Sequence, residues 1–215
     1  MKYGESTFDI LYLIFAVASG CLILWKASDR TEKLMGIAAI VLGAGDAFHL
    51  IPRVLNYFTA WNLDAALGIG KLITSVTMTV FYVLLYYIWL GHYHEWEEVN
   101  NRMTVVIWAL AAIRIALCLF PQNGWLKNGG SISWGIYRNV PFIMLGLNIC
   151  WLYYQKRNED KTFRFFWLLI LLSFLFYIPV VVGSSDIPML GMLMLPKTIC
   201  YILMIASFLK SIREA

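Results

Sequence analysis

Charged side chains are scarce in this sequence of 215 residues. Only 14% of the residues are Asp, Glu, Lys or Arg, whereas 60% are hydrophobic. A soluble domain carries about 25% charged residues, so the composition excludes an ordinary soluble protein. Since little of the chain lies outside apolar runs, we expect a single all-α membrane domain over residues 1–215. The net charge of +4 fits short loops beside the membrane and does not indicate a nucleic-acid partner.

Cysteine and histidine are also rare, and their positions argue against several kinds of site. The four cysteines lie in apolar segments: Cys21, Cys118, Cys150 and Cys200. None belongs to a C-x-x-C pair, so we interpret them as small buried hydrophobic residues. The H-x-H stretch His92–His94 is followed by several glutamates, which is more typical of a solvated turn than of a metal site. We therefore predict no metal and no cofactor. The N-terminus lacks a basic segment followed by a cleavage site, so no cleaved signal peptide is expected.

Long apolar runs are the main feature that the sequence does have. A run of about 18 residues or more predicts a transmembrane helix. We expect seven of them: Asp9–Trp25, Leu34–Phe58, Ala65–Leu90, Met103–Phe120, Trp134–Tyr154, Phe163–Val182 and Leu190–Leu209.

The distribution of lysine and arginine in the connections predicts the orientation, because cytoplasmic loops are enriched in both. One side carries Lys26, Arg30, Lys33, Arg102, Lys156, Arg157, Lys161, Arg164, Lys210 and Arg213, and the other carries only Lys2 and Lys127. The N-terminus is therefore expected outside and the C-terminus in the cytoplasm. We expect a bacterial cytoplasmic membrane protein.

Seven charged or titratable side chains lie inside the apolar runs, clear of the first and last two residues of each run: Asp46, His49, Arg53, Lys71, Arg114, Arg138 and Lys197. A charge in the bilayer core costs at least about 2.5 kcal/mol, so such residues usually face a cavity, a partner or a ligand. With a rise of about 1.5 Å per residue, all seven fall in the outer half of the membrane. The long basic side chains could instead extend to the outer interface. Asp46 is too short for that and is expected to pair with Lys71 or Lys197.

Five bases and one acid leave a surplus of positive charge in the apolar runs. Because buried charge of one sign is unstable without a counterion, we predict a pocket that binds a small anionic ligand. The expected ligand-binding residues are Asp46, His49, Arg53, Lys71, Ser75, Arg114, Arg138, Asn139, Lys197 and Tyr201. Ser75 lies one turn from Lys71, although hydroxyl groups in such helices often bond only the carbonyl four residues earlier.

The two halves of the chain can be overlaid as residues 8–91 and 134–210, linked by the fourth run. Cys21 then matches Cys150, Pro52 matches Pro179 and Lys71 matches Lys197, at nearly constant offsets of 129, 127 and 126 residues. A parallel repeat of three helices is a known transporter plan. It would place the two lysines across a shared site.

This three-plus-one-plus-three plan resembles the SWEET sugar transporters and the PnuC vitamin transporters over the whole chain. Pro52, Pro141 and Pro179 are similar to the SWEET pattern, but the first run has no proline and Pro121 lies in a loop. The resemblance implies a site between the two triplets. Opsins also carry a lysine in the last helix, but here the third run lacks a counterion acid. The zinc hydrolases related to alkaline ceramidase need histidines that the last run lacks.

Three functions stay open at the level of sequence. A transporter of a small anion is favoured by the repeat, the prolines and the excess of bases. An intramembrane enzyme acting on a lipid would use Asp46 and His49 as acid and base, but no nucleophile is marked. A ligand sensor would need a cytoplasmic partner. Membrane lipids are expected partners in each case, and homo-oligomeric assembly stays open.

Overall fold

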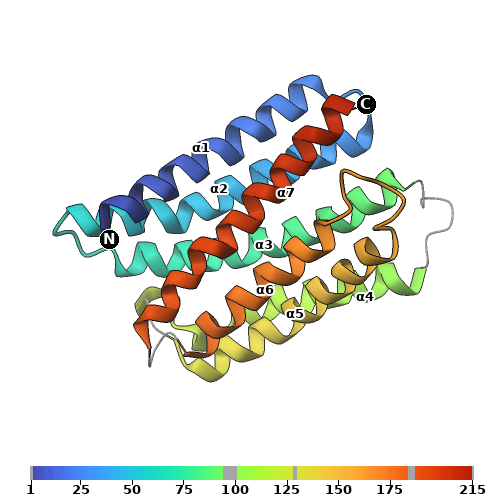
Figure 1. Cartoon of the computed structure of the whole chain (residues 1–215). Coiled ribbons are helices and arrows are strands. Elements are labelled where there is room, and N and C mark those ends of the chain that lie inside the picture. Colours follow the sequence, from blue (N-terminus) through green and yellow to red (C-terminus); the bar gives the residue numbers. More distant parts are fainter. Residues whose placement is uncertain (1, 94–100, 128–129, 184–186, 215) are drawn as a thin grey trace.

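The chain is all-helical in the computed structural model, which describes residues 2–93, 101–127, 130–183 and 187–214. These residues form seven α-helices, three short 3-10 helices and no strand (Figure 1). The α-helices are α1 (Lys2–Lys26), α2 (Arg30–Phe58), α3 (Asp64–His92), α4 (Asn101–Leu119), α5 (Ile132–Gln155), α6 (Phe166–Gly183) and α7 (Met194–Glu214). The predicted all-α class is therefore confirmed, and each predicted run overlaps one α-helix. His94 of the H-x-H stretch lies outside the described residues.

Six helices in the described residues are long and apolar enough to cross a membrane. They are α1, α2, α3, the Arg102–Leu119 part of α4, α6, and Met189–Arg213, which includes α7. This set is typical of a membrane-embedded protein. Helix α5 has 24 residues but is not among the six. It carries Arg138 and Asn139, two of the residues expected in the pocket.

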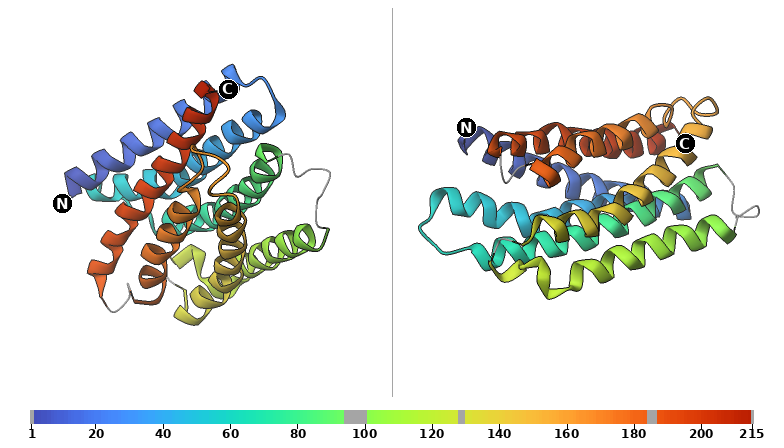
Figure 2. Two further views of the ribbon diagram at one scale, coloured as in Figure 1. Left: turned by 45° about the vertical axis from the view of Figure 1, so that its right-hand side comes forward. Right: turned by 90° about the horizontal axis from the view of Figure 1, so that it is seen from below.

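The helices run up and down, so that their connections alternate between two ends of the bundle. The N-terminus lies at the same end as the α2–α3, α4–α5 and α6–α7 connections, and the C-terminus lies at the other end (Figures 1 and 2). Each helix packs on the next in the chain, and α7 packs back on α1. Further contacts join α3 to α5 and α2 to α7. The bundle is therefore closed, and α3 lies deep inside it.

Aspartate side chains order two connections at the end of the bundle that holds the C-terminus. Asp29 accepts a hydrogen bond from the Glu32 amide, 2.7 Å away, and so starts α2 at Arg30, four residues before the predicted run. Asp160 accepts hydrogen bonds from the amides of Thr162 and Phe163 and lies 2.8 Å from Nε2 of His92. This contact ties the end of α3 to the α5–α6 connection.

Aromatic side chains fill the half of the bundle nearer the C-terminus. Tyr82, Tyr86, Tyr153, Phe166 and Phe208 are all buried. The hydroxyl groups of the three tyrosines are hydrogen-bonded: that of Tyr153, for example, donates to the Leu85 carbonyl at 3.1 Å. A buried tyrosine hydroxyl usually has such a partner, and in this half of the bundle the Tyr93 hydroxyl is an exception. The intramembrane charges lie in the other half.

Helices α2 and α3 approach each other closely because both carry glycine at their contact. A Cβ atom on Gly45 would overlap the Thr77 side chain, and one on Gly70 would overlap the backbone at Phe48. Small residues let two helix backbones come together in this way. The close packing brings Thr74 near enough to donate a hydrogen bond to the Gly45 carbonyl at 3.0 Å. It also fixes α3 beside His49, at the level of the charged residues.

Candidate functional site

Two cavities adjoin at the end of the bundle that holds the N-terminus. Each has a volume of about 340 Å³. Four residues line both of them and therefore form the partition: His49, Thr74, Met194 and Lys197. We name the first the acidic cavity, because Glu5, Asp9 and Asp46 line it, and the second the basic cavity, because Lys71, Arg114 and Arg138 line it. No Asp or Glu of the described residues lines the basic cavity.

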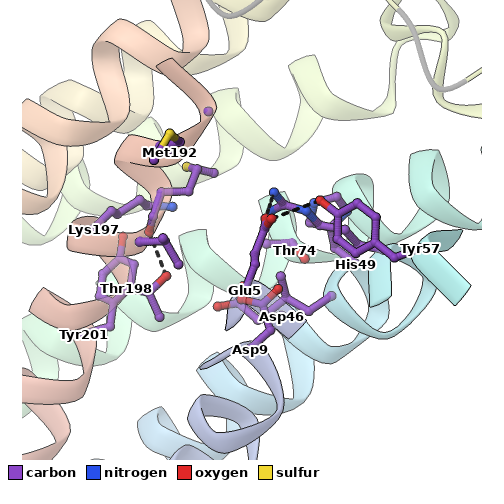
Figure 3. Close-up of a pocket in the computed structure, with 15 residues that line it drawn as sticks. Glu5, Asp9, Asp46, His49, Tyr57, Thr74, Met192, Lys197, Thr198 and Tyr201 are labelled. Atoms are coloured by element: carbon purple, nitrogen blue, oxygen red, sulfur yellow. Dashed lines mark hydrogen bonds and ion pairs between the residues drawn. The ribbon is translucent and has the colours of Figure 1, made fainter. Parts of the chain in front are cut away.

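Helix α1 supplies the acidic face of the first cavity. Glu5, Asp9 and Tyr12 follow one another at spacings of four and three residues, which place them on one face of a helix. Asp9 is only 5% exposed, and its Oδ2 atom has no hydrogen-bond partner. The Tyr12 hydroxyl donates to Oδ2 of Asp46 at 2.7 Å. The carboxylates of α1 and α2 therefore gather on one wall, and Lys197, Thr198 and Tyr201 of α7 stand opposite (Figure 3).

Arg53 finds its counterion on α1. Its Nη2 atom pairs with Oε1 of Glu5, and the Tyr57 hydroxyl donates to the other oxygen of Glu5 at 3.1 Å. Asp46 is therefore not the only acid beside the buried bases, and the prediction of a single acid is wrong. Asp9 lies at the first position of the predicted run, and α1 begins at Lys2 and so brings Glu5 into the bundle as well.

We expect Glu5→Gln to lower the free energy of unfolding modestly, by roughly 1 kcal/mol, because the pair with Arg53 is still partly open to solvent. The side chains of Arg53 and Glu5 are 29% and 21% exposed. Thermal unfolding in detergent of Glu5→Gln, Arg53→Gln and the double variant would measure the coupling. Glu159→Gln, which breaks the more exposed pair with Lys156, is the matched control. Strictly additive effects of the two substitutions would show that the pair contributes nothing.

Arg114 is the most deeply buried base of the second cavity. It is 2% exposed, and its guanidinium carbon lies 3.3 Å from the centroid of the Phe142 ring. Its Nη1 atom reaches Oδ1 of Asn139 only at 3.5 Å, and its Nε atom has no hydrogen-bond partner. The same Asn139 oxygen already accepts a shorter hydrogen bond, 2.9 Å long, from the Tyr177 hydroxyl. The guanidinium group therefore keeps unused donors.

The α4–α5 connection positions Arg138 at the basic cavity. Asn123 directs its amide nitrogen to the carbonyls of the last turn of α4, at 2.8 Å from that of Leu117, and its Oδ1 atom accepts a hydrogen bond from Arg138 at 2.7 Å. The guanidinium carbon of Arg138 also lies 4.6 Å from the Trp125 ring. Gly124 makes the turn between them possible, since its φ of 63° is costly for other residues.

The two lysines face the basic cavity from α3 and α7. The Nζ atom of Lys197 lies 4.6 Å from the Tyr177 ring and 5.3 Å from the Tyr201 ring, within the range of a cation–π contact. The positive charges of Arg138 and Arg53 repel Lys71, and the negative charge of Asp64 attracts it. The expected ion pair of Asp46 with Lys71 or Lys197 is not the contact observed. Asp46 accepts a hydrogen bond from Tyr12, and its interaction with the Lys197 ammonium group is a longer-range charge attraction.

The hydroxyl groups of α3 are mostly used within the helices. The Ser75 hydroxyl donates to the Lys71 carbonyl four residues earlier, at 2.7 Å, although the residue lines the basic cavity. Thr79 does the same to Ser75 at 2.8 Å. Both hydroxyl groups therefore bond the carbonyl four residues earlier, as hydroxyl groups in membrane helices often do, instead of being left free for a ligand.

Nine of the ten residues expected in the pocket line one of the two cavities, and His49 and Lys197 line both. The exception is Asn139, which lies behind Arg114 and bonds it. The sequence analysis missed Glu5, Asp9 and Tyr12. Their four-and-three spacing is the signal that could have found them, but the predicted run Asp9–Trp25 begins after Glu5 and so shows only Asp9 and Tyr12. Among the described residues, no group of three or more His, Cys, Asp or Glu side chains is placed to hold a metal ion.

Comparisons with protein-family models, with curated proteins and with solved structures found no match to this chain. We therefore infer function from the two cavities.

Proposed function

We propose that this protein binds a small anion in the basic cavity and carries it across the membrane. The ligand would present a phosphate or carboxylate group, either on a free solute or on a lipid headgroup. The observation that carries the proposal is Arg114, a buried cation with an unpartnered Nε atom. Arginine matches phosphate and carboxylate groups geometrically, because its donors form a planar fork.

The charge around Arg114 also supports an anionic ligand. Lys71, Arg138 and Lys197 line the same cavity, and no acid among the described residues lines it with them. Removing several like charges from water is costly unless counter-charge compensates it. A bound anion would supply that compensation and would satisfy the free donors of Arg114. A cavity of about 340 Å³ lies at the small end of the usual range for ligand sites.

The packing of the helices supports transport. Under a parallel repeat, α1, α2 and α3 correspond to α5, α6 and α7. The contacts of α2 with α1 and α3 then match those of α6 with α5 and α7, and the α1–α7 contact matches the α5–α3 contact. Lys71 and Lys197 would be equivalent residues on the wall of one cavity. In repeat-built transporters the substrate site lies at such an interface between repeats.

For this function we also propose a seventh membrane span and an outward-facing N-terminus, as expected from the sequence. Helix α5 would be the seventh span, made less apolar by residues that face the ligand. The N-terminus, and with it both cavities, would lie on the outer side of the membrane. An enzymatic role is less well supported, because the hydroxyl of Ser75, the hydroxyl expected beside the bases, is bonded to a backbone carbonyl.

Native mass spectrometry of the gently purified protein, followed by reconstitution, would test this function. We expect the wild type to retain an added mass and Lys71→Gln to lose most of it. Lys33→Gln, at the exposed start of α2, should behave as the wild type. A small soluble mass that liposomes then take up supports solute transport, and a phospholipid mass that moves between leaflets supports a headgroup carrier. Wild-type protein without any added mass would overturn the anion site. A bound molecule that does not cross the liposome membrane would overturn transport.

A further inference from the structure

We infer that the acidic cavity is a separate proton-binding site, in which Asp9 and Asp46 hold one proton between them. The inference deepens the proposed function, because a proton bound beside the anion site would couple its movement to that of the anion. The site itself stands on its own geometry and can be tested without knowing the anion.

The first observation is the carboxylate of Asp9. It is 5% exposed, lines the acidic cavity, and leaves Oδ2 without a donor. An ionised carboxylate with a buried oxygen that accepts no hydrogen bond carries a desolvation cost. Protonation removes the charge and so removes most of that cost. Asp9 is therefore a natural proton acceptor.

The second observation is the balance of charge that surrounds this carboxylate. Helix α1 contributes Glu5, Asp9 and Tyr12, helix α2 contributes Asp46, His49, Arg53 and Tyr57, and helix α7 contributes Lys197 and Tyr201. Helix α3 contributes only the neutral Thr74 to this cavity and holds Lys71 on the other one.

Glu5 and Arg53 neutralise each other. His49, whose Nδ1 atom is buried, lines the cavity with Arg53 and Lys197 and is counted as neutral, which leaves two carboxylates and Lys197. Tyr12 donates a hydrogen bond to Asp46 and so favours its charged form. One excess negative charge remains, and one proton on the pair of carboxylates balances it. Two acids that interact in this way titrate as a pair.

A proton fits this cavity better than a metal cation does. Sodium and calcium ions need several oxygen ligands around one point. Among the described side chains no cluster of three or more acidic, histidine or cysteine groups offers that geometry. Arg53 and Lys197 also line the cavity and would repel a metal ion placed there.

Lys197 connects this site to the basic cavity, because it lines both. When Asp9 and Asp46 are both charged, they attract the Lys197 ammonium group and weaken its field in the basic cavity. When one is protonated, only one carboxylate still opposes Lys197, and more of its positive field reaches the anion in the basic cavity. Proton binding should therefore strengthen anion binding, with a coupling of at least about fivefold, as in typical linked sites.

Infrared difference spectroscopy on the whole purified protein, titrated with acid without added anion, tests the inference. A protonated carboxylic acid gives its own C=O stretching band, which shifts in D₂O. We expect such a band at a pH at which the exposed carboxyl groups of the chain are still ionised, both in the wild type and in the control Asp64→Asn, which alters an acid at the start of α3 that lines neither cavity. It should be lost or displaced in Asp9→Asn and in Asp46→Asn. Lys197→Met should retain the band and make it appear at a higher pH, because a cation that opposes protonation is gone.

A band that survives in both aspartate variants, or no band in the wild type, would overturn the proton site. A band that Lys197→Met leaves at the same pH would overturn the link between the cavities. The outcome is independent of the anion test, because a protein that binds no anion still shows or lacks this band.

Discussion

Arg114→Met is expected to abolish most anion retention without unfolding the protein. Hydrogen bonds to a charged group contribute about 1.5–3 kcal/mol each, so losing the guanidinium should weaken binding by roughly tenfold or more. Arg114 is 2% exposed and has no acidic partner among the described residues. Replacing a buried charge by an apolar side chain of similar length is often neutral or stabilising. The thermal midpoint without ligand should therefore stay the same or rise.

Native mass spectrometry and thermal unfolding of the same samples would measure both effects. Arg164→Met, which changes an exposed arginine outside the cavities, is the matched control and should leave both unchanged. Arg114→Lys should keep part of the binding, since it keeps the charge and loses the fork. If Arg114→Met instead destabilised the ligand-free protein and left retention intact, Arg114 would be a structural residue of the α4–α5 contact.

Gly70→Ala is expected to cause the largest loss of stability among single-atom additions at the contact of α2 with α3. The new Cβ atom would overlap the carbonyl oxygen of Phe48 and lie 2.8 Å from Cα of His49. Both neighbours are backbone atoms, so no side chain can rotate away and the two helices must separate. Overpacking of this kind costs about 1–3 kcal/mol and occasionally more. The separation would also displace His49 from the partition between the cavities.

Thermal unfolding in detergent, with the yield of folded protein, would measure this effect. Gly4→Ala is the control, because a Cβ atom there meets nothing within 4 Å. Ala is also the better helix former, so the control should be neutral or slightly stabilising. An equal midpoint for the two variants would mean that α2 and α3 pack less closely than described.

The membrane class and the positions of the helices follow from the sequence, because each depends on local composition. A run long enough to span the bilayer is apolar whatever its neighbours are, and six such helices are observed. The ends were less predictable. Asp29 adds a turn to α2 through its cap, and α1 extends over the polar segment from Lys2 because Glu5 and Asp9 find partners or a cavity inside the bundle.

The sequence by itself also determined which residue types must be accommodated: five bases within apolar runs, too costly to leave unsolvated. Only the tertiary structure decided how each is accommodated. Arg53 pairs with Glu5, Arg138 with Asn123, and Arg114 lines the basic cavity with its Nε atom left without a hydrogen-bond partner. These partners are 48 and 15 residues apart in the chain, and the packing of the helices and the α4–α5 connection bring them together. A pocket of uniform sign was therefore the reasonable prediction, whereas the folded bundle separates an acidic cavity from a basic one.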